Sequence, residues 1–461
     1  MKTKKINYVY KTEPYDHQRD VLEVSWAARY WALFLEMGTG KSKIICDTIG
    51  MLYERKEINA ALILAPKGVF DNWVKGEIPT HLPDRIERNV LRWTPSKTKA
   101  FQEKLRAITY EDSEDLKIFV MNIEAFSSAR GTKAAQTFLN SNPDNIVVVD
   151  ESTTIKNRKA ARTKNIVELE ELSKYRRILT GSPVTKSPMD LFSQCLFLSP
   201  RALGFNSFFA FQGRYAMVQR RTMGHRSFQE IVGYRRLDEL NEKLLTFSSR
   251  ILKEDCLDLP PRIYVRREIE LTDEQAKLYT QMKRLALAQL NNGELATTSS
   301  VLTQIMRLQQ ICCGFLQPDE GPIEPLPNNR LSGLMSAIDE TQGKVIIWAS
   351  YTYDIQRITS ALRDRFGPEA VATYYGATPQ DERQDIIEKF QDVNSELRFF
   401  VGQPKTGGFG ITLHAASTMI YFSNSYDLEI RLQSESRAHR INQTKSVTYI
   451  DLVSPNTIDE K

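Results

Sequence analysis

Two sets of short, continuous apolar runs, separated by segments of helical length, constrain the fold of this chain more than any other feature. The runs are rich in β-branched residues, which is typical of strands that a parallel sheet buries on both faces. They comprise residues 60–65, 118–121 and 146–149 in the first set and 344–348, 398–401, 419–422 and 447–450 in the second. Because each set alternates with helical segments, we expect two α/β lobes, each a parallel sheet flanked by helices.

Length and composition agree with this division. At 461 residues the chain is too long for one hydrophobic core. Its hydrophobic fraction of 41% and charged fraction of 26% are those of an ordinary soluble protein. No apolar run approaches the roughly 20 residues that cross a bilayer, and no apolar region of a secretory signal follows the basic amino terminus. The cysteines form no CxxC pair, so we expect a reducing cytosol and no structural metal.

The segment between the two sets of strands has a different character. From about residue 200 to residue 330 the strand signals fade, and the sequence becomes helical and rich in Arg, Leu and Gln. Residues 317–329 are rich in Pro and Gly, which is typical of a loop or linker. We therefore expect a first lobe at residues 1–199 with a helical insertion at residues 200–257. A second lobe should start at residues 258–330, with a helical insertion and a linker, and continue through residues 331–461.

The hexapeptide Met-Gly-Thr-Gly-Lys-Ser near the amino terminus is a candidate phosphate-binding loop. Gly38, Thr39 and Gly40 permit a tight turn from a strand into a helix, with backbone N–H groups directed at phosphate. Lys41 would place a positive charge between the β- and γ-phosphates of a nucleotide, and Ser42 would offer its hydroxyl to Mg²⁺. The strict motif has one more glycine upstream, so a simple glycine-rich turn is the alternative.

Two acidic residues follow the apolar run 146–149 directly. Asp150 and Glu151 should therefore lie at the carboxyl end of a buried strand, where α/β sheets bind their ligands. Asp150 can hold Mg²⁺, and Glu151 can orient or deprotonate an attacking water. The alternative is the solvated start of a loop, but the phosphate loop upstream favours a nucleotide site.

Two arginines near the carboxyl end, Arg437 and Arg440, are spaced to lie on one side of a helical turn. Paired guanidinium groups suit the charge that develops on a transferring γ-phosphate. The alternative is an exposed helix face with Glu435 in local ion pairs. A phosphate loop at one end and paired arginines at the other indicate two lobes that close on one nucleotide.

Several segments resemble the sequence motifs of one family. Residues 150–157, 179–183 and 433–443 look like motifs II, III and VI of the Swi/Snf-type ATPases, which are DNA translocases within helicase superfamily II. The resemblance runs from about Pro14 to the carboxyl end and keeps the order of the motifs. The segments similar to the Q motif and to motifs Ia, Ib, IV and V are residues 14–18, 64–67, 121–124, 344–351 and 407–413.

The resemblance implies a P-loop helicase core of two RecA-like lobes that uses ATP and Mg²⁺. The catalytic residues that it implies are Lys41, Asp150, Glu151, Arg437 and Arg440. The residues that it implies for ATP are Gln18, which would read the adenine edge, and Gly38, Thr39, Gly40, Lys41, Ser42, Gly410, Arg437 and Arg440. Mg²⁺ would be held by Ser42 and Asp150. The residues implied to couple hydrolysis to lobe movement are Thr153, Thr180, Ser182 and Gln433.

The same motifs imply contacts with double-stranded or branched DNA, made to phosphates rather than to base edges. The residues are Lys67, Asn122, Ser350, Lys405, Thr406 and Gly407. Two basic clusters either touch nucleic acid as well or form solvated surface; they are residues 156–164 and the set Arg214, Arg220, Arg221 and Arg226. The aromatic residues Trp73, Trp93, Tyr374 and Tyr375 fit core packing better than base stacking.

From the resemblance we expect an ATP-dependent double-stranded DNA translocase that remodels forks, branched DNA or protein–DNA complexes. We expect a compact, monomeric, cytoplasmic enzyme of a bacterium or phage. A strand-separating helicase acting on DNA or RNA is one alternative. The other is a nucleotide-regulated DNA-binding switch with little turnover, which Thr153 favours because the family usually has histidine at that position.

Overall fold

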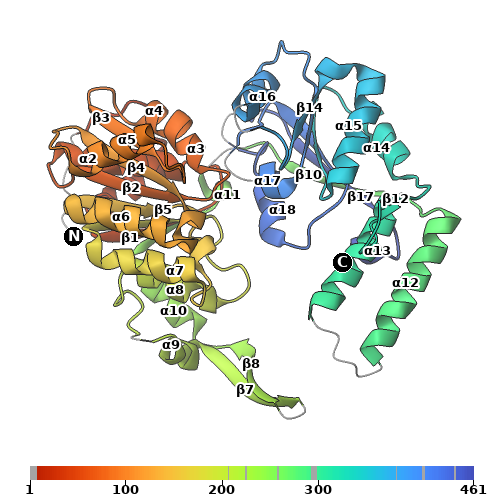
Figure 1. The fold of residues 1–461 in the computed structure, drawn as a ribbon, viewed down its shortest axis with the longest axis horizontal. Helices are drawn as coiled ribbons and strands as arrows, with labels where there is room; N and C mark the ends of the chain where they lie inside the picture. Colours follow the sequence, from red (N-terminus) through yellow and green to blue (C-terminus); the bar gives the residue numbers. More distant parts are fainter. Residues whose placement is uncertain are drawn as a thin grey trace. The chain divides into compact units, whose positions relative to one another are not determined.

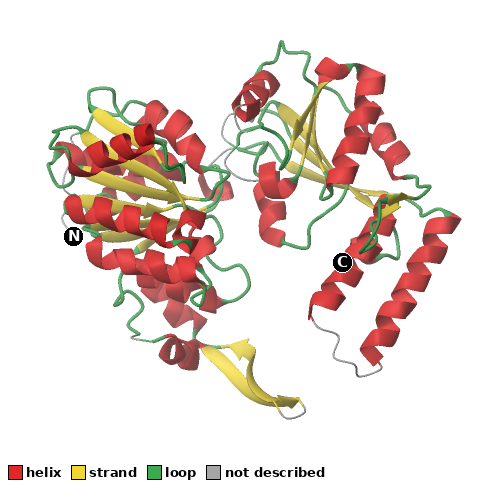
Figure 2. Cartoon of the chain, viewed as in Figure 1, coloured by secondary structure: helices red, strands yellow, loops and turns green. Residues whose placement is uncertain are grey.

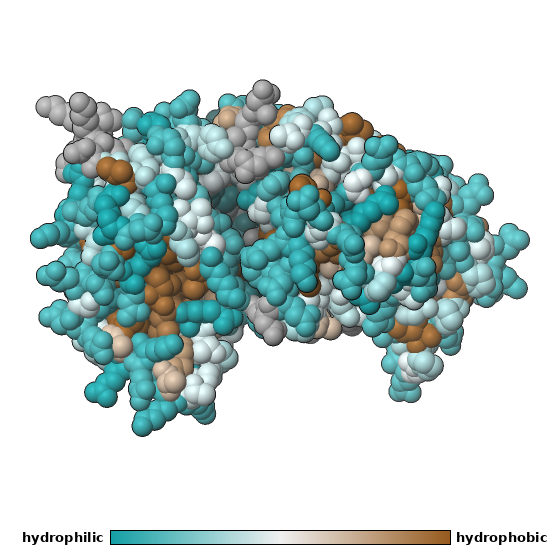
Figure 3. Space-filling view, turned by 90° about the horizontal axis from the view of Figure 1, so that it is seen from above, coloured by the Kyte–Doolittle hydropathy of each residue, from teal (hydrophilic) through white to brown (hydrophobic). Residues whose placement is uncertain are grey.

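The computed structural model describes residues 8–205, 207–223, 226–256, 259–291, 298–379, 382–407, 411–440 and 443–460. The chain divides into two compact units, Met1–Asp258 (unit 1) and Leu259–Lys461 (unit 2), drawn in Figure 1. Hydrophilic side chains cover most of the face of each unit that Figure 3 shows, and hydrophobic ones form small patches. Within the described ranges no helix is both long and apolar enough to span a membrane.

Unit 1 is built on a seven-stranded sheet with the order β3-β4-β2-β5-β6-β1-β9, in which every pair of neighbours is parallel. The strands β2 and β5 are buried along their whole length, as continuous apolar runs require. The three strands expected in this half of the chain are confirmed. The strands are β1 (Tyr30–Leu35), β2 (Ala60–Ala65), β3 (Arg88–Arg92), β4 (Leu116–Asn122), β5 (Asn145–Val149), β6 (Tyr175–Leu179) and β9 (Ser248–Ile251).

Helices lie on both faces of this sheet (Figure 2). In α5, for example, Phe101, Leu105 and Ile108 recur at helical spacing and pack into the core, while the charged residues between them face solvent. The helices of unit 1 are α1 (Asp16–Ser25), α2 (Lys41–Glu54), α3 (Phe70–Asn72), α4 (Ile78–His81), α5 (Lys99–Tyr110), α6 (Ala129–Ser141), α7 (Ala161–Val167), α8 (Leu191–Leu198), α9 (Phe208–Tyr215), α10 (Leu237–Leu245) and α11 (Lys253–Cys256).

The insertion expected to be helical at residues 200–257 is only partly so. Helices α9 and α10 flank an antiparallel hairpin of β7 (Ala216–Met223) and β8 (Arg226–Tyr234), and β9 then joins the edge of the main sheet beside β1. The expectation was wrong here because it rested on composition. Val, Ile, Phe and Tyr in the second half of the hairpin favour strands, and the partner strand of β9 lies more than 200 residues away.

Unit 2 contains a six-stranded sheet with the order β10-β17-β16-β13-β15-β14, again parallel at every pair. The four strands expected in the second half of the chain are confirmed. The strands are β10 (Arg262–Glu268), β13 (Lys344–Trp348), β14 (Val371–Tyr374), β15 (Phe399–Gly402), β16 (Ala416–Tyr421) and β17 (Val447–Val453).

The first strand of this sheet, β10, lies in the segment where the sequence indicated helices. Its residues are mostly exposed and rich in arginine, so no buried apolar run announces it, and its position depends on pairing with β17 at the other end of the unit. The helical expectation holds for the long helices α12 (Asp273–Asn291) and α13 (Thr298–Cys313). The remaining elements are β11 (Phe315–Leu316), β12 (Glu324–Pro325), α14 (Arg330–Asp339), α15 (Thr352–Phe366), α16 (Glu382–Gln391), α17 (Pro404–Gly407) and α18 (Leu428–Glu435).

Candidate active site

Three candidate motifs of unit 1 meet at the carboxyl edge of its sheet. The neighbouring strands β1, β6 and β5 end there, followed by the glycine loop, motif III and the acidic pair. A Cβ atom on Gly181 would lie 3.2 Å from Cγ and 3.3 Å from N of Met37. The guanidinium of Arg250 joins the strand before the glycine loop to motif III, because its Nη1 donates to Phe34 O in β1 (3.0 Å) and to Gly181 O (2.9 Å). These contacts hold motif III against the glycine loop.

The glycine loop has the geometry of a phosphate cradle. Gly38 and Gly40 have φ values of +83° and +88°, a left-handed conformation that glycine adopts at little cost. Helix α2 starts at Lys41, so its first N–H groups, including that of the half-buried Ser42, stand at the loop. The Lys41 ammonium donates to Leu35 O at 3.0 Å and Glu36 O at 3.4 Å. Lysine, helix terminus and loop therefore share one location, which fits phosphate.

Gln18 is bound to this loop rather than exposed. The side chain is 1% exposed; its Nε2 donates to Thr39 O (3.0 Å) and its Oε1 accepts from the Tyr15 N–H (3.1 Å). His17 Nε2 also lies 2.9 Å from Thr39 O. Helix α1 is thus tied to the cradle, and the contact of His17 was not predicted from the sequence.

Asp150 and Glu151 follow β5, as expected. Asp150 is nearly buried, and its Oδ2 accepts a hydrogen bond from Trp73 Nε1 (2.9 Å) while its Oδ1 accepts from the Glu151 N–H (3.0 Å). Glu151 itself adopts a left-handed backbone with φ of +48°, which is uncommon for a residue with a side chain. Trp73 is fully buried, so core packing was the correct interpretation, and its indole also orients the acid.

These residues fit Mg²⁺ only together with phosphate. Across the residues that the structure describes, no group of three or more His, Cys, Asp or Glu side chains could hold a metal. Mg²⁺ commonly uses one or two carboxylates and completes its shell with phosphate oxygens and water. Ser42 in the first turn of α2 and Asp150 beyond β5 suit that arrangement, so the donor set matches a nucleotide-bound cation.

A buried glutamine that was not predicted from the sequence joins motifs II and III. Gln194 on α8 is fully buried; its Oε1 accepts from Ser152 Oγ (2.7 Å), and its Nε2 donates to Pro183 O (2.9 Å) and Asp190 O (2.8 Å). The only local indication of this role is an amide inside a largely apolar helix. The coupling candidates lie around this bridge: Thr153 and Thr180 are buried, and Thr180 Oγ1 accepts from the Ser182 N–H (3.2 Å).

Two of the expected DNA contacts stand at the ends of neighbouring strands in unit 1. Asn122, the last residue of β4, pairs in register with the end of β2, two residues before Lys67. Asn122 Nδ2 donates to Glu124 Oε2 (3.2 Å), and the Lys67 N–H donates to Glu124 Oε1 (3.5 Å). The carboxylate of Glu124 therefore organises both residues.

The other expected DNA contacts gather at the carboxyl edge of the second sheet. Ser350 follows β13, and its carbonyl accepts a hydrogen bond from Gln403 Nε2 (3.0 Å), just after β15. Lys405 and Thr406 lie in α17, where Lys405 is exposed. Gly407 packs on the buried Trp348, since a Cβ there would lie 2.8 Å from the indole. Gly410 lies outside the described residues.

The arginine pair of unit 2 differs from the expectation in its local structure. Helix α18 ends at Glu435, so Arg437 and Arg440 lie in the turns beyond it and not on one helix face. Both converge on one carbonyl, because Arg437 Nη1 (3.1 Å) and Arg440 Nη1 (3.2 Å) donate to Ile411 O. Arg437 is only 7% exposed. The alternative of an exposed helix face is thus wrong, although Glu435 does form a local ion pair, with Arg431 (2.6 Å).

Gln433, one turn before Arg437, has an unusual environment. The side chain is 1% exposed, and neither its amide oxygen nor its nitrogen has a hydrogen-bond partner among the described residues. A buried amide without partners is costly and calls for an explanation. The carbonyl of the same residue accepts from Arg437 Nε (2.9 Å), so Gln433 lies directly beside the arginine pair.

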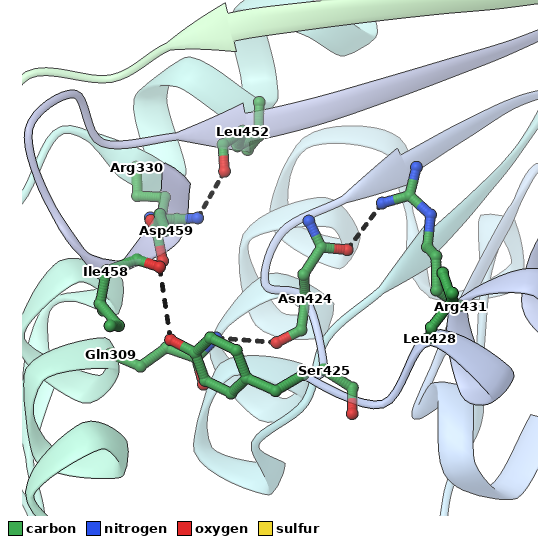
Figure 4. A pocket seen from close by; sticks show the side chains of 10 residues that line it. Gln309, Arg330, Asn424, Ser425, Leu428, Arg431, Leu452, Ile458 and Asp459 are labelled. Atoms are coloured by element: carbon green, nitrogen blue, oxygen red, sulfur yellow. Dashed lines mark hydrogen bonds and ion pairs between the residues drawn. The ribbon is translucent and has the colours of Figure 1, made fainter. Parts of the chain in front are cut away.

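A pocket of about 290 Å³ within unit 2 lies apart from the motifs (Figure 4). Its walls are held by Arg330, whose Nη1 pairs with Asp459 Oδ2 (2.6 Å), and by Arg431, whose Nη1 donates to Asn424 Oδ1 (2.7 Å). Gln309 Nε2 donates to Asn424 O (2.7 Å). Because these polar groups bind one another, the pocket wall is a structural network that anchors the last residues of the chain.

Comparison with known proteins accounts for both units. The model of the SNF2-related domain matches residues 17–315, well over half of the chain, and the helicase conserved C-terminal domain matches residues 329–442. The chain belongs to the SNF2 family. The expected fold class, two RecA-like lobes with parallel sheets, is therefore confirmed.

Named SNF2 relatives are similar across most of this chain. The chromatin-remodeling subunit snf22 of Schizosaccharomyces pombe is 26% identical over 92% of the chain and 25% of its own length. ISW2, an ISWI chromatin-remodeling complex ATPase of Saccharomyces cerevisiae, is 27% identical over 92% of this chain and 37% of its own length. MG018 of Mycoplasma genitalium, named an ATP-dependent helicase, is 26% identical over 92% of this chain and 38% of its own length. The chain thus spans a quarter to less than half of these relatives.

Among solved structures, the SWI2/SNF2 ATPase core of Sulfolobus solfataricus in complex with double-stranded DNA is 23% identical in sequence. The similarity covers 99% of this chain and 91% of that one, with a TM-score of 0.46.

Two further residues of this SNF2 chain have structural roles. His439 Nδ1 accepts a hydrogen bond from Arg262 Nε (3.2 Å), so its Nε2 carries the proton and donates to Pro260 O (2.8 Å). These two contacts join the turn that carries the arginine pair to the start of β10 and the residues before it. Burial lowers the pKa of Arg250, the residue that bridges the glycine loop and motif III, from its usual value.

Proposed function

We propose that the chain is an ATP- and Mg²⁺-dependent motor that moves along double-stranded DNA. One observation carries the nucleotide half of the proposal. The glycine loop, motif III and the acidic pair occupy three adjacent strand ends at one sheet edge, and Arg250 ties motif III to β1, the strand that leads into the loop. An α/β sheet binds its ligands at that edge, and family membership supports ATP as the ligand.

In this mechanism each residue has a defined task. The loop N–H groups and Lys41 hold the β- and γ-phosphates, and Glu151 orients and deprotonates the attacking water. Ser42 and Asp150 would hold Mg²⁺, which would supply neutralisation of charge on the phosphates. Gln18, fixed to the loop, is assigned to the adenine.

Arg437 and Arg440 are proposed to complete the reaction from unit 2. Their guanidinium groups converge on Ile411 O, and a group of this shape binds phosphate oxygens bidentately. We propose that contacts with the γ-phosphate replace these contacts with the carbonyl. The buried amide of Gln433, which belongs to α18 and lies beside the arginines, would then transmit their movement to that helix.

We propose that the chain contacts the phosphates of the DNA through Lys67, Asn122, Ser350, Lys405, Thr406 and Gly407. Each lies at the end of a strand or shortly after one, at the carboxyl edge of its sheet, where several such groups can contact one nucleic-acid backbone. The finer proposal is that the motor remodels forks, branched DNA or protein–DNA complexes. A strand-separating helicase is the second candidate, which the helicase C-terminal match supports.

We predict ATP hydrolysis that duplex DNA stimulates. ATP turnover should be measured with duplex, single-stranded, forked and four-way DNA and with RNA, side by side with a reaction that lacks nucleic acid. A translocase displaces the third strand of a triplex without opening the duplex, whereas a helicase separates the strands. Equal rates with and without every nucleic acid would refute the motor, and tight ATP-modulated DNA binding without released phosphate would favour a switch.

We also predict that Gly40→Ala weakens ATP binding by at least about tenfold. The new Cβ would lie 2.1 Å from Gln18 Nε2 at a φ of +88°, so both the loop and its contact with α1 must shift. Gly343→Ala in unit 2 is the control, because its φ is +76° but no atom lies within 4 Å. Both should lose about 1–2 kcal/mol to backbone strain, and only the first should lose nucleotide affinity in a fluorescent-ATP titration.

A further inference from the structure

Positive charge is concentrated in two segments of unit 1. Residues 214–236, which include the β7–β8 hairpin, contain six arginines and one glutamate, and residues 156–164 contain five basic residues and no acid. The whole chain has a net charge of only +5. Each of the two segments has a net charge of +5 by itself, so the remainder of the chain has a net negative charge.

Helix α9 connects these two segments in the structure. The guanidinium of Arg158 lies 4.1 Å from the ring centroid of Phe208 and 5.3 Å from that of Phe209, both at the start of α9. Helix α9 ends at Tyr215, and β7 starts at the next residue. Residues 156–164 therefore contact the helix that leads directly into the second segment, although about fifty residues of chain separate the two segments. Residues 156–164, 214–223 and 226–236 are together called the hairpin surface below.

One face of the hairpin has side chains that suit phosphate. The register pairs Arg220 with Gln229 and Thr222 with Ser227, and residues two apart share a face of a ribbon. All four are exposed, and Arg220 Nη2 donates to Ser227 Oγ (2.9 Å). A guanidinium, two hydroxyls and an amide can all donate to phosphate oxygens. Glu230, the acid of the hairpin, is on the other face, in an ion pair with Arg221.

The shape of the hairpin also points to a large partner. In Figure 1 the ribbon extends away from the sheet of unit 1. Val218 on one strand and Val232 on the other are 39% and 52% exposed, so little packing stabilises the ribbon by itself. At about 3.3 Å per residue, the eight residues of β7 reach about 26 Å. The major groove of duplex DNA, about 12 Å wide, admits a two-stranded ribbon of this kind.

We infer that the hairpin surface binds duplex DNA, with the ribbon in the major groove and its arginines on the phosphates. The inference rests on the proposed DNA motor and adds a contact outside the helicase motifs. Arginine suits the task because its planar group binds phosphate with two parallel hydrogen bonds, and the hairpin segment contains arginine and no lysine.

The test compares two variants of the full chain that lose the same charge. Arg220→Gln/Arg221→Gln removes two exposed guanidinium groups of the hairpin, and Lys104→Gln/Arg106→Gln removes two exposed charges from α5 of the same unit. Duplex binding is measured by fluorescence anisotropy between 50 and 200 mM salt. The hairpin variant should bind several-fold more weakly, and its salt slope should fall by about one. Arg220 lies on the face that suits phosphate, Arg221 is held by Glu230, and each phosphate contact contributes about 0.9.

The outcomes separate the hairpin from the motor. The α5 variant should bind DNA like the wild type, and both variants should keep the basal ATPase rate and the thermal midpoint. Equal loss in both variants, or no loss in either, overturns the hairpin contact even if DNA stimulates the wild-type ATPase. A wild type without DNA-stimulated turnover whose hairpin variant still loses duplex affinity refutes the motor and supports the contact. Unchanged DNA affinity together with lost capture of an acidic protein would also overturn the inference.

Discussion

Lys41→Ala is expected to reduce ATP turnover by about 10²–10³-fold, the cost of removing one preorganised group that stabilises transition-state charge. The ammonium stands at the start of α2, beside the two glycines with left-handed backbones. Alanine would leave the loop and helix intact but would remove the charge that faces the β- and γ-phosphates. Phosphate release with saturating duplex DNA measures the effect, and exposed Lys133→Ala on α6 is the control.

Glu151→Gln separates binding from chemistry in the same assay. The amide has nearly the shape of the carboxylate but cannot accept a proton, so turnover should fall by about 10²–10⁴-fold while ATP still binds. If Lys41→Ala and Glu151→Gln both retained most of the wild-type rate, the proposed active site would be in the wrong place. Loss of turnover with lost ATP binding in Glu151→Gln would instead assign this residue to nucleotide binding.

Arg330→Met is expected to lower the free energy of unfolding of unit 2 by about 3–5 kcal/mol, as expected when one member of a buried ion pair is removed. Arg330 is 1% exposed and donates to Leu452 O (2.6 Å), Phe422 O (2.7 Å) and Asp459 Oδ2 (2.6 Å). It thereby joins the ends of β16 and β17 to the last turn of the chain. Methionine fills a similar volume but leaves the Asp459 carboxylate buried without its cation.

The measurement is amide hydrogen exchange in β16 and β17, which reports opening of this unit without a contribution from unit 1. Arg365→Met is the matched control, since Arg365 pairs with Asp339 across 2.7 Å but both side chains are about half exposed. Its cost should stay below about 1 kcal/mol. Adding Asp459→Asn to Arg330→Met should recover part of the loss, because the orphaned charge is the main penalty. A cost for Arg330→Met no larger than that of the control would contradict the proposed anchor.

The elements that could be predicted from the sequence are those whose signal is local. Strands β2 and β5 are buried on both faces, so their continuous apolar runs identified them without any knowledge of their neighbours. The glycine loop could be predicted in the same way, because Gly38 and Gly40 form a tight turn whose left-handed backbone favours glycine. The acidic pair followed from its place directly after a buried strand.

Other features depended on partners far along the chain. Strand β10 and the hairpin are largely exposed, so no regular pattern of apolar residues indicated them. The spacing of Arg437 and Arg440 suggested a helix, but helix α18 ends at Glu435. The contacts of Gln194 with motifs II and III involve residues 11 and 42 positions away.

The sequence by itself determined the type of fold and the chemistry of the nucleotide loop, because backbone conformation and burial on both faces leave their marks within a few residues. Only the tertiary structure decided which distant groups support that chemistry. Arg250 reaches Phe34 O across 216 positions, and Trp73 reaches Asp150 across 77. A hydrogen bond between such residues depends on the order of strands in the sheet, which no local pattern of residue types encodes.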